Sequence, residues 1–87
     1  MISIIIPAYN HQTINNAILS ILKQPINNLE IIIIDDSPNN QIKKNISALN
    51  NPKIQYYKNK NNIGTTNSRI KGIKKSKGNY IGFLDDD

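Results

Sequence analysis

The chain has 87 residues, no cysteine and a formal net charge of +5 at pH 7. This length allows one domain or part of one, and the lack of cysteine excludes a disulfide framework and a thiolate metal site. The lysines are spread over several segments, which indicates an unselective preference for anionic partners and predicts no nucleic-acid partner. The apolar runs are far shorter than the roughly 20 residues of a membrane span, and no basic leader precedes the first of them. We therefore expect no membrane span in this chain and a cytoplasmic location.

Four runs rich in β-branched or aromatic residues predict strands, and three stretches of helical periodicity separate them. The first strand is expected at residues 2–6, followed by a helix with Thr13 as its N-cap that ends before Pro25. A strand at 30–35 precedes a second helix, which is closed by the sequence Asn-Asn-Pro at 50–52. A more polar strand at 54–58 is expected at a sheet edge. The third helix, at about 65–77, contains Gly72 and should end at Gly78 in the left-handed conformation, before a last strand at 80–84.

This βαβαβαβ order predicts an α/β fold with a Rossmann-like parallel sheet and right-handed crossovers. The strand order expected for such a doubly wound sheet is 3-2-1-4. Ligands of these sheets bind beyond the carboxyl ends of the strands, where the strand order reverses. The loops expected to bind a ligand are therefore those at residues 7–12, 35–39, 59–66 and 85–87.

Two of these four loops are acidic, because Asp35 and Asp36 follow the second strand and Asp85, Asp86 and Asp87 follow the fourth. In the expected order the ends of these two strands lie about two strand spacings apart, roughly 10 Å, which a nucleoside diphosphate can bridge. One carboxylate could accept a hydrogen bond from a base, and the triplet could hold a divalent cation on the diphosphate. Oxygen ligands without histidine or cysteine favour Mg²⁺ or Mn²⁺. The alternative is that these aspartates only form turns and cap helices.

Four segments in register carry a resemblance to a known family: IIIPAYN at 4–10, LEIIIIDDS at 29–37, NIG at 62–64 and GNYIGFLDDD at 78–87. Together they resemble the opening half of the family 2 glycosyltransferases, which have the GT-A fold. The resemblance implies that residues 1–87 are the incomplete N-terminal nucleotide-sugar-binding part of such a domain. The implied activity is hexosyl or hexosaminyl transfer from a nucleotide-diphosphate sugar, with a UDP-sugar as the leading candidate, to a glycan, lipid or protein acceptor with inversion. Such enzymes serve polysaccharide biosynthesis.

The same resemblance assigns roles to residues at the start of the chain. Pro7, Ala8 and Tyr9 would form a loop that cradles the nucleotide base, with Tyr9 as a stacking surface. Asp36 matches the carboxylate that contacts the base. Arg69 stands where the family often has the Arg of an Ala-Arg-Asn sequence, but its neighbours differ here, so a nucleotide-facing role and a surface helix position both stay open.

The acidic triplet matches the family's D-x-D motif. Asp85 or Asp86 would meet the ribose or the diphosphate, and Asp87 would ligate Mn²⁺ or Mg²⁺. The resemblance implies that the general base lies beyond Asp87. We therefore assign no catalytic residue in this chain and expect the 87 residues alone to be inactive.

Four other classes of protein can be compared with this pattern. A response-regulator receiver domain also carries an acidic pair after a strand, but after its first strand, whereas a complete βα unit precedes the pair here. A non-catalytic nucleotide-binding remnant of a glycosyltransferase stays open as the alternative function. A dinucleotide-binding domain and a P-loop enzyme are disfavoured, because neither G-x-G-x-x-G nor a Walker motif follows the first strand.

Overall fold

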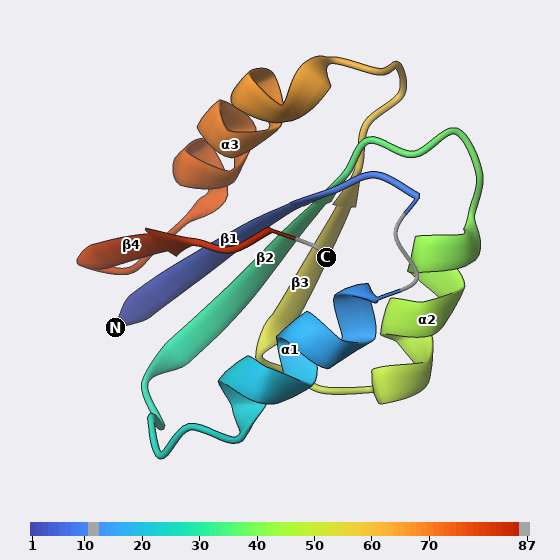
Figure 1. Ribbon diagram of the computed structural model, residues 1–87. Coiled ribbons are helices and arrows are strands. Elements are labelled where there is room, and N and C mark those ends of the chain that lie inside the picture. Colours follow the sequence, from blue (N-terminus) through green and yellow to red (C-terminus); the bar gives the residue numbers. More distant parts are fainter. Residues whose placement is uncertain (11–12, 86–87) are drawn as a thin grey trace.

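Four parallel strands form one sheet in the order β3-β2-β1-β4 in the computed structural model of the chain (Figure 1). The structure describes residues 1–10 and 13–85. The elements are β1 (Ile2–Ala8), α1 (Ile14–Leu22), β2 (Leu29–Asp35), α2 (Gln41–Leu49), β3 (Ile54–Lys58), α3 (Gly64–Lys75) and β4 (Tyr80–Phe83). The predicted βαβαβαβ order and the predicted strand order 3-2-1-4 are both confirmed, and so is the edge position of β3.

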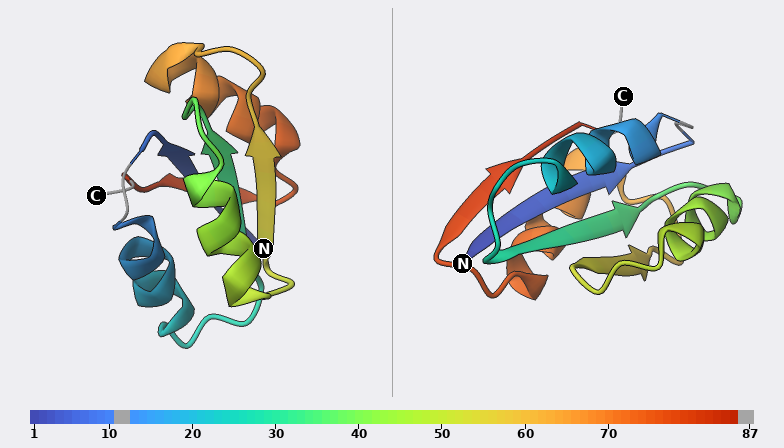
Figure 2. Two further views of the ribbon diagram at one scale, coloured as in Figure 1. Left: turned by 90° about the vertical axis from the view of Figure 1, so that its right-hand side faces the viewer. Right: turned by 90° about the horizontal axis from the view of Figure 1, so that it is seen from below.

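Helices cover both faces of the sheet, with α1 and α2 on one face and α3 on the other (Figures 1 and 2). Successive strand residues point to opposite faces, so the isoleucine runs of β1 and β2 supply both layers. One core lies against α1 and α2 and contains Ile6, Ile31 and Ile33. A smaller one, with Ile5, Ile32 and Ile34, lies on the α3 side. A strand covered on both faces needs this continuous apolar run, and β2 is buried along its whole length.

Two glycines allow α3 and the turn after it to approach β1 closely. A Cβ at Gly72 would overlap the side chain of Ile5, and a Cβ at Gly78 would lie 2.6 Å from the carbonyl oxygen of Met1. The expectation that Gly78 is left-handed is wrong. Helix α3 ends earlier, at Lys75, and the next residue, Ser76, has an extended backbone conformation. Among the described glycines only Gly64 has positive φ. Gly78 is needed for space rather than for backbone freedom.

The first strand is longer than predicted, because it continues through Pro7 and Ala8. These two residues pair with Ile34 and Asp35 of β2, and both are buried. Proline is tolerated because its missing N–H would point toward β4, whose ladder in the described chain reaches only Ile5. The expectation that Pro7 and Ala8 belong to a loop is therefore wrong.

A buried glutamate ties the amino-terminal edge of the sheet to the turn between α3 and β4. Glu30, on the α3 face of β2, accepts hydrogen bonds from the hydroxyl of Ser3 at 2.6 Å, the amide of Gln55 at 2.7 Å and the backbone N–H of Lys77 at 2.6 Å. The backbone N–H of Gly78 donates to Ser3 Oγ at 2.9 Å. Three strands and the end of α3 thus converge on one carboxylate.

The outer side of β4 is open in the described part of the chain. Ile70 and Ile73 of α3 and Ile81 and Phe83 of β4 are exposed apolar side chains. None of the described helices is both long and apolar enough to cross a bilayer.

Candidate functional site

The carboxyl ends of β1, β2, β3 and β4 meet at one edge of the sheet, as the parallel register requires. This register brings Asp36, which follows β2, and Asp85, which follows β4, to the same edge, as predicted. Asp86 and Asp87, the other predicted members of the acidic triplet, lie outside the described residues.

A pocket of about 360 Å³ opens at this edge, beyond the ends of β1, β2 and β3. Of the residues predicted to bind nucleotide, Tyr9 and Asp36 line it together, whereas Pro7 and Ala8 are not in its lining. Tyr9 is 46% exposed, so part of its ring is accessible at the surface. The remaining lining residues are polar apart from one proline: Ser37, Pro38, Lys58, Asn59, Lys60, Asn61 and Asn62.

Asp36 is a buried carboxylate held by the loop before α3. Its Oδ1 accepts hydrogen bonds from Asn59 Nδ2 and the backbone N–H of Ile63, both at 2.9 Å, and its Oδ2 accepts one from the backbone N–H of Gly64 at 2.9 Å. Burial raises the pKa of Asp36, but these hydrogen bonds and the nearby charge of Lys58 outweigh it and hold the pKa below its usual value. The carboxylate is therefore charged at neutral pH, and it caps the amino terminus of α3 from the loop after β2.

Asp35 points to the opposite face of the sheet and makes a different set of contacts. Its Oδ1 accepts a hydrogen bond from the backbone N–H of Ser37 at 2.9 Å, which closes the turn after β2. Its Oδ2 accepts one from the hydroxyl of Tyr56 and lies 3.6 Å from Lys58 Nζ. The ammonium of Lys58 also donates to the carbonyl oxygens of Ser37 and Asn39. These contacts fasten the loop after β2 to the end of β3, so the turn-and-cap interpretation describes the contacts of both aspartates.

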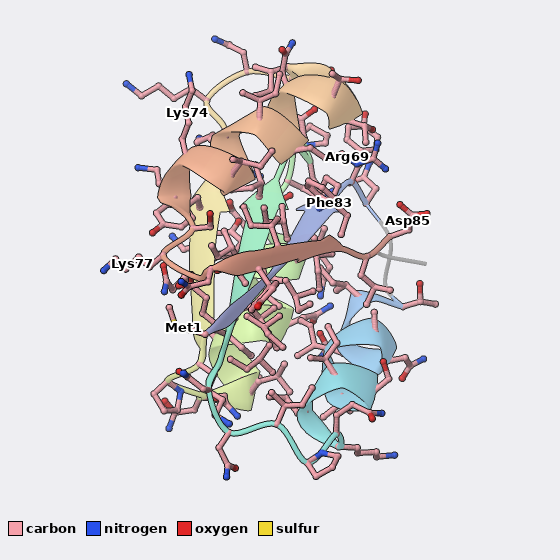
Figure 3. All side chains as sticks on the ribbon, turned by 90° about the vertical axis from the view of Figure 1, so that its left-hand side faces the viewer. Met1, Arg69, Lys74, Lys77, Phe83 and Asp85 are labelled. Atoms are coloured by element: carbon pink, nitrogen blue, oxygen red, sulfur yellow. The ribbon has the colours of Figure 1, made fainter. Side chains whose placement is uncertain are left out.

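Arg69 and Asp85 meet on the other side of β1, where α3 passes β4 (Figure 3). Arg69 Nη2 lies 3.5 Å from Asp85 Oδ1, and its guanidinium lies 5.9 Å from the centre of the Phe83 ring. The two side chains are 42% and 72% exposed, respectively. The predicted site thus has two parts, the pocket lined by Tyr9 and Asp36 and the charged pair of Arg69 and Asp85. The described residues contain no cluster of three or more metal-ligating side chains.

Sequence reasoning missed Asn59 and Lys58 as site residues. Both lie at the end of the edge strand β3. The chain contains many asparagines and lysines, so nothing in the sequence singles out these two. Lys71, which donates to Asn59 Oδ1 at 2.7 Å, was missed for the same reason. For Asn59 the available signal was its place directly after a strand of the expected sheet.

The fold and the site define a class, a Rossmann-like α/β domain with its polar pocket at the carboxyl ends of the strands. The sequence pattern of glycosyl transferase family 2 matches residues 3–87, and the chain belongs to this family.

Relatives and solved structures agree with this membership. The chain is 40% identical over 88 residues to the UDP-Glc:α-D-GlcNAc-diphosphoundecaprenol β-1,3-glucosyltransferase WfaP of Escherichia coli, covering 100% of this chain and 35% of that protein. It is 38% identical over 93 residues to an uncharacterized glycosyltransferase of Haemophilus influenzae, covering 100% and 36%. The chain thus spans about a third of the length of these two relatives.

Two solved structures share the fold. The structure of TarS of S. aureus superimposes with a TM-score of 0.85 at 24% identity, covering 99% of this chain and 16% of that one. The mannosyltransferase of Pyrobaculum calidifontis, solved with GDP-Man and Mn²⁺, has a TM-score of 0.85 at 18% identity, covering 99% and 27%.

Proposed function

We propose that this chain is the donor-binding part of a glycosyltransferase domain that uses a nucleotide-diphosphate sugar and a divalent cation. The observation that carries the proposal is the pocket at the carboxyl edge, in which Tyr9 and the charged Asp36 face one space. An aromatic ring and a carboxylate acceptor suit a nucleobase, which offers a flat face for stacking and N–H groups for hydrogen bonds. The relative WfaP is named for UDP-glucose, which makes a UDP-sugar the leading candidate.

The diphosphate would extend from this pocket toward Arg69 and Asp85. Arg69 carries a fork of N–H donors that suits phosphate oxygens, and its pairing with the exposed Asp85 leaves both at the surface. Asp85, Asp86 and Asp87 offer carboxylate oxygens, the donors that Mn²⁺ and Mg²⁺ prefer. When bound, the cation would neutralise charge on the diphosphate leaving group. Asp87 is proposed as its ligand, with Asp85 or Asp86 at the ribose or diphosphate.

The transfer itself is proposed for the whole domain. A general base and the acceptor-binding segments would come from residues other than these 87, and transfer with inversion to a glycan, lipid or protein acceptor is part of the same proposal. Two relatives, WfaP and a Campylobacter jejuni glucosyltransferase, are named for undecaprenol-linked acceptors. The 87 residues alone are expected to bind the donor without turnover.

Nuclear magnetic resonance titration of the isotope-labelled chain tests the donor site. UDP at millimolar concentration should shift the backbone amide signals of Tyr9, Ile63 and Gly64. Paramagnetic Mn²⁺ added with UDP should broaden the signals nearest Asp85. Uridine, which lacks phosphate, is the matched control: it should shift the pocket signals but should gain nothing from Mg²⁺.

Asp87→Asn should remove most of the metal dependence of UDP binding, and Asp36→Ala should weaken uridine and UDP alike. Unchanged metal dependence in Asp87→Asn would show that the triplet only forms a turn. If neither UDP nor any other nucleoside diphosphate shifts the pocket signals, the donor-binding proposal is wrong.

A further inference from the structure

Asn59 is a buried amide that connects the end of β2 to helix α3. Its side chain is nearly inaccessible, at 6% exposure. Its Nδ2 donates to Asp36 Oδ1 at 2.9 Å and to Ser68 Oγ at 3.3 Å, and its Oδ1 accepts a hydrogen bond from Lys71 Nζ at 2.7 Å. Its backbone N–H donates to the carbonyl oxygen of Asp35 at 2.9 Å. Both amide donors are therefore used, and Lys71 fixes which side of the amide faces Asp36.

This arrangement limits what Asp36 can offer to a ligand. An ionised carboxylate has about four acceptor positions, two on each oxygen. Oδ1 is filled by Asn59 and Ile63, and Oδ2 holds one bond from Gly64. Within the described part of the chain, one acceptor position remains, on Oδ2. Because Asp36 lines the pocket, a ligand there meets a single charged acceptor.

We propose that Asn59 is a positioning residue that sets the base specificity of the pocket, which rests on the donor-binding function proposed above. By filling Oδ1 it leaves one acceptor, which matches a base with one ring N–H, uracil or thymine. Guanine presents two adjacent donors and needs both carboxylate oxygens to satisfy them. Adenine and cytosine present an unprotonated ring nitrogen at this position, which a carboxylate repels. The ligand class is therefore a uridine or thymidine diphosphate.

The first test changes the ligand and leaves the protein intact. A methyl group on N3 of uracil removes the one donor that Asp36 can accept. UDP should bind the isotope-labelled chain at least about tenfold more tightly than N3-methyl-UDP, the range for a lost hydrogen bond to a charged group. GDP should also bind more weakly than UDP. The backbone amide signals of Ile63 and Gly64 report directly on the Asp36 carboxylate, because both N–H groups donate to it.

The second test changes Asn59. Asn59→Ala frees one acceptor position on Oδ1, so the preference for UDP over GDP should fall at least about fivefold, which loss of packing alone would not cause. Asn27→Ala is the matched control, because Asn27 is an exposed asparagine between α1 and β2, at the amino ends of the strands and away from the pocket. It should keep the preference. Lys71→Met releases the amide of Asn59 without opening a space beside Asp36, and should lower the preference in the same direction.

Each outcome decides between the two proposals. Equal binding of UDP and N3-methyl-UDP, or an unchanged UDP-to-GDP ratio in a folded Asn59→Ala variant, would overturn the role of Asn59 and leave donor binding intact. If Asn59→Ala does not fold, an unchanged ratio in Lys71→Met overturns it. Failure of every nucleoside diphosphate to bind would overturn the donor-binding proposal and this inference together.

Discussion

Replacing Glu30 by glutamine should destabilise the fold while keeping the shape of the side chain. The carboxylate accepts three hydrogen bonds, from Ser3, Gln55 and Lys77. A hydrogen bond to a charged acceptor contributes about 1 kcal/mol more than one between neutral groups. Gln55 can turn its amide over to meet the new donor, so two of the three bonds carry the loss. We expect Glu30→Gln to lower the free energy of unfolding by about 2 kcal/mol, which corresponds to a melting temperature roughly 8–16 °C lower for a domain of this size.

The size of this loss should depend on pH. Burial raises the pKa of Glu30, but the hydrogen bonds from Ser3, Lys77 and Gln55 outweigh it and lower the pKa below the usual value of 4.5. A group whose pKa is lower in the folded than in the unfolded state contributes stability above its unfolded pKa. That contribution is lost as the pH falls through the folded pKa. Glutamine does not titrate, so the wild-type chain and Glu30→Gln should converge in stability in acid.

Urea unfolding followed by circular dichroism, at neutral pH and in a series down to strongly acidic pH, measures both effects. Asp36 also has a lowered pKa, but it is present in both proteins and cancels in the difference. Asp85→Asn is the matched control, since it removes an exposed carboxylate whose surface ion pair contributes at most about 1 kcal/mol. A Glu30→Gln variant as stable as wild type at neutral pH, or a difference that persists unchanged in acid, would refute the reasoning.

Two further predictions concern α3 and β3. Gly72→Ala should destabilise the chain by about 1–3 kcal/mol in urea unfolding, although alanine favours helices, because the new methyl group would overlap the fully buried Ile5; equal stability would mean that α3 can move away without cost. Burial, together with the hydrogen bond to Asp35 and its charge, raises the pKa of the Tyr56 hydroxyl, so Tyr56 should be the last tyrosine to ionise in an alkaline spectrophotometric titration. Tyr56→Phe should remove that last step, and a titration whose last step survives in Tyr56→Phe would contradict the contact.

The sheet could be predicted because the apolar composition of its central strands indicates that both of their faces are buried. The seven residues from Leu29 to Asp35 contain four isoleucines in a row, a run that is typical of a strand covered on both faces. The more polar composition of β3 indicated that it is an edge strand. The details that failed depend on distant contacts. Pro7 reads as the start of a loop until the position at which β4 stops pairing with β1 is known.

Gly78 shows the same limit at the other end of the chain. A glycine after a helix most often adopts the left-handed conformation, and that local rule predicted its role incorrectly. What makes glycine necessary is the approach of Met1 and Ser3, residues at the opposite end of the sequence. No pattern within α3 contains that information.

The candidate site was predictable in position but not in its contacts. Parallel strands place Asp36 at the carboxyl edge, and the alternation of strand side chains turns Asp35 to the other face. The partners of Asp36, however, are the side-chain amide of Asn59 and two backbone N–H groups, which lie 23, 27 and 28 residues further along the chain. The same carboxylate therefore caps α3 and lines the pocket, so any substitution of Asp36 changes the fold and the proposed base contact together. Only a change on the ligand, such as N3-methylation of uracil, removes the base contact while leaving the cap in place, and this makes it the decisive experiment on the site.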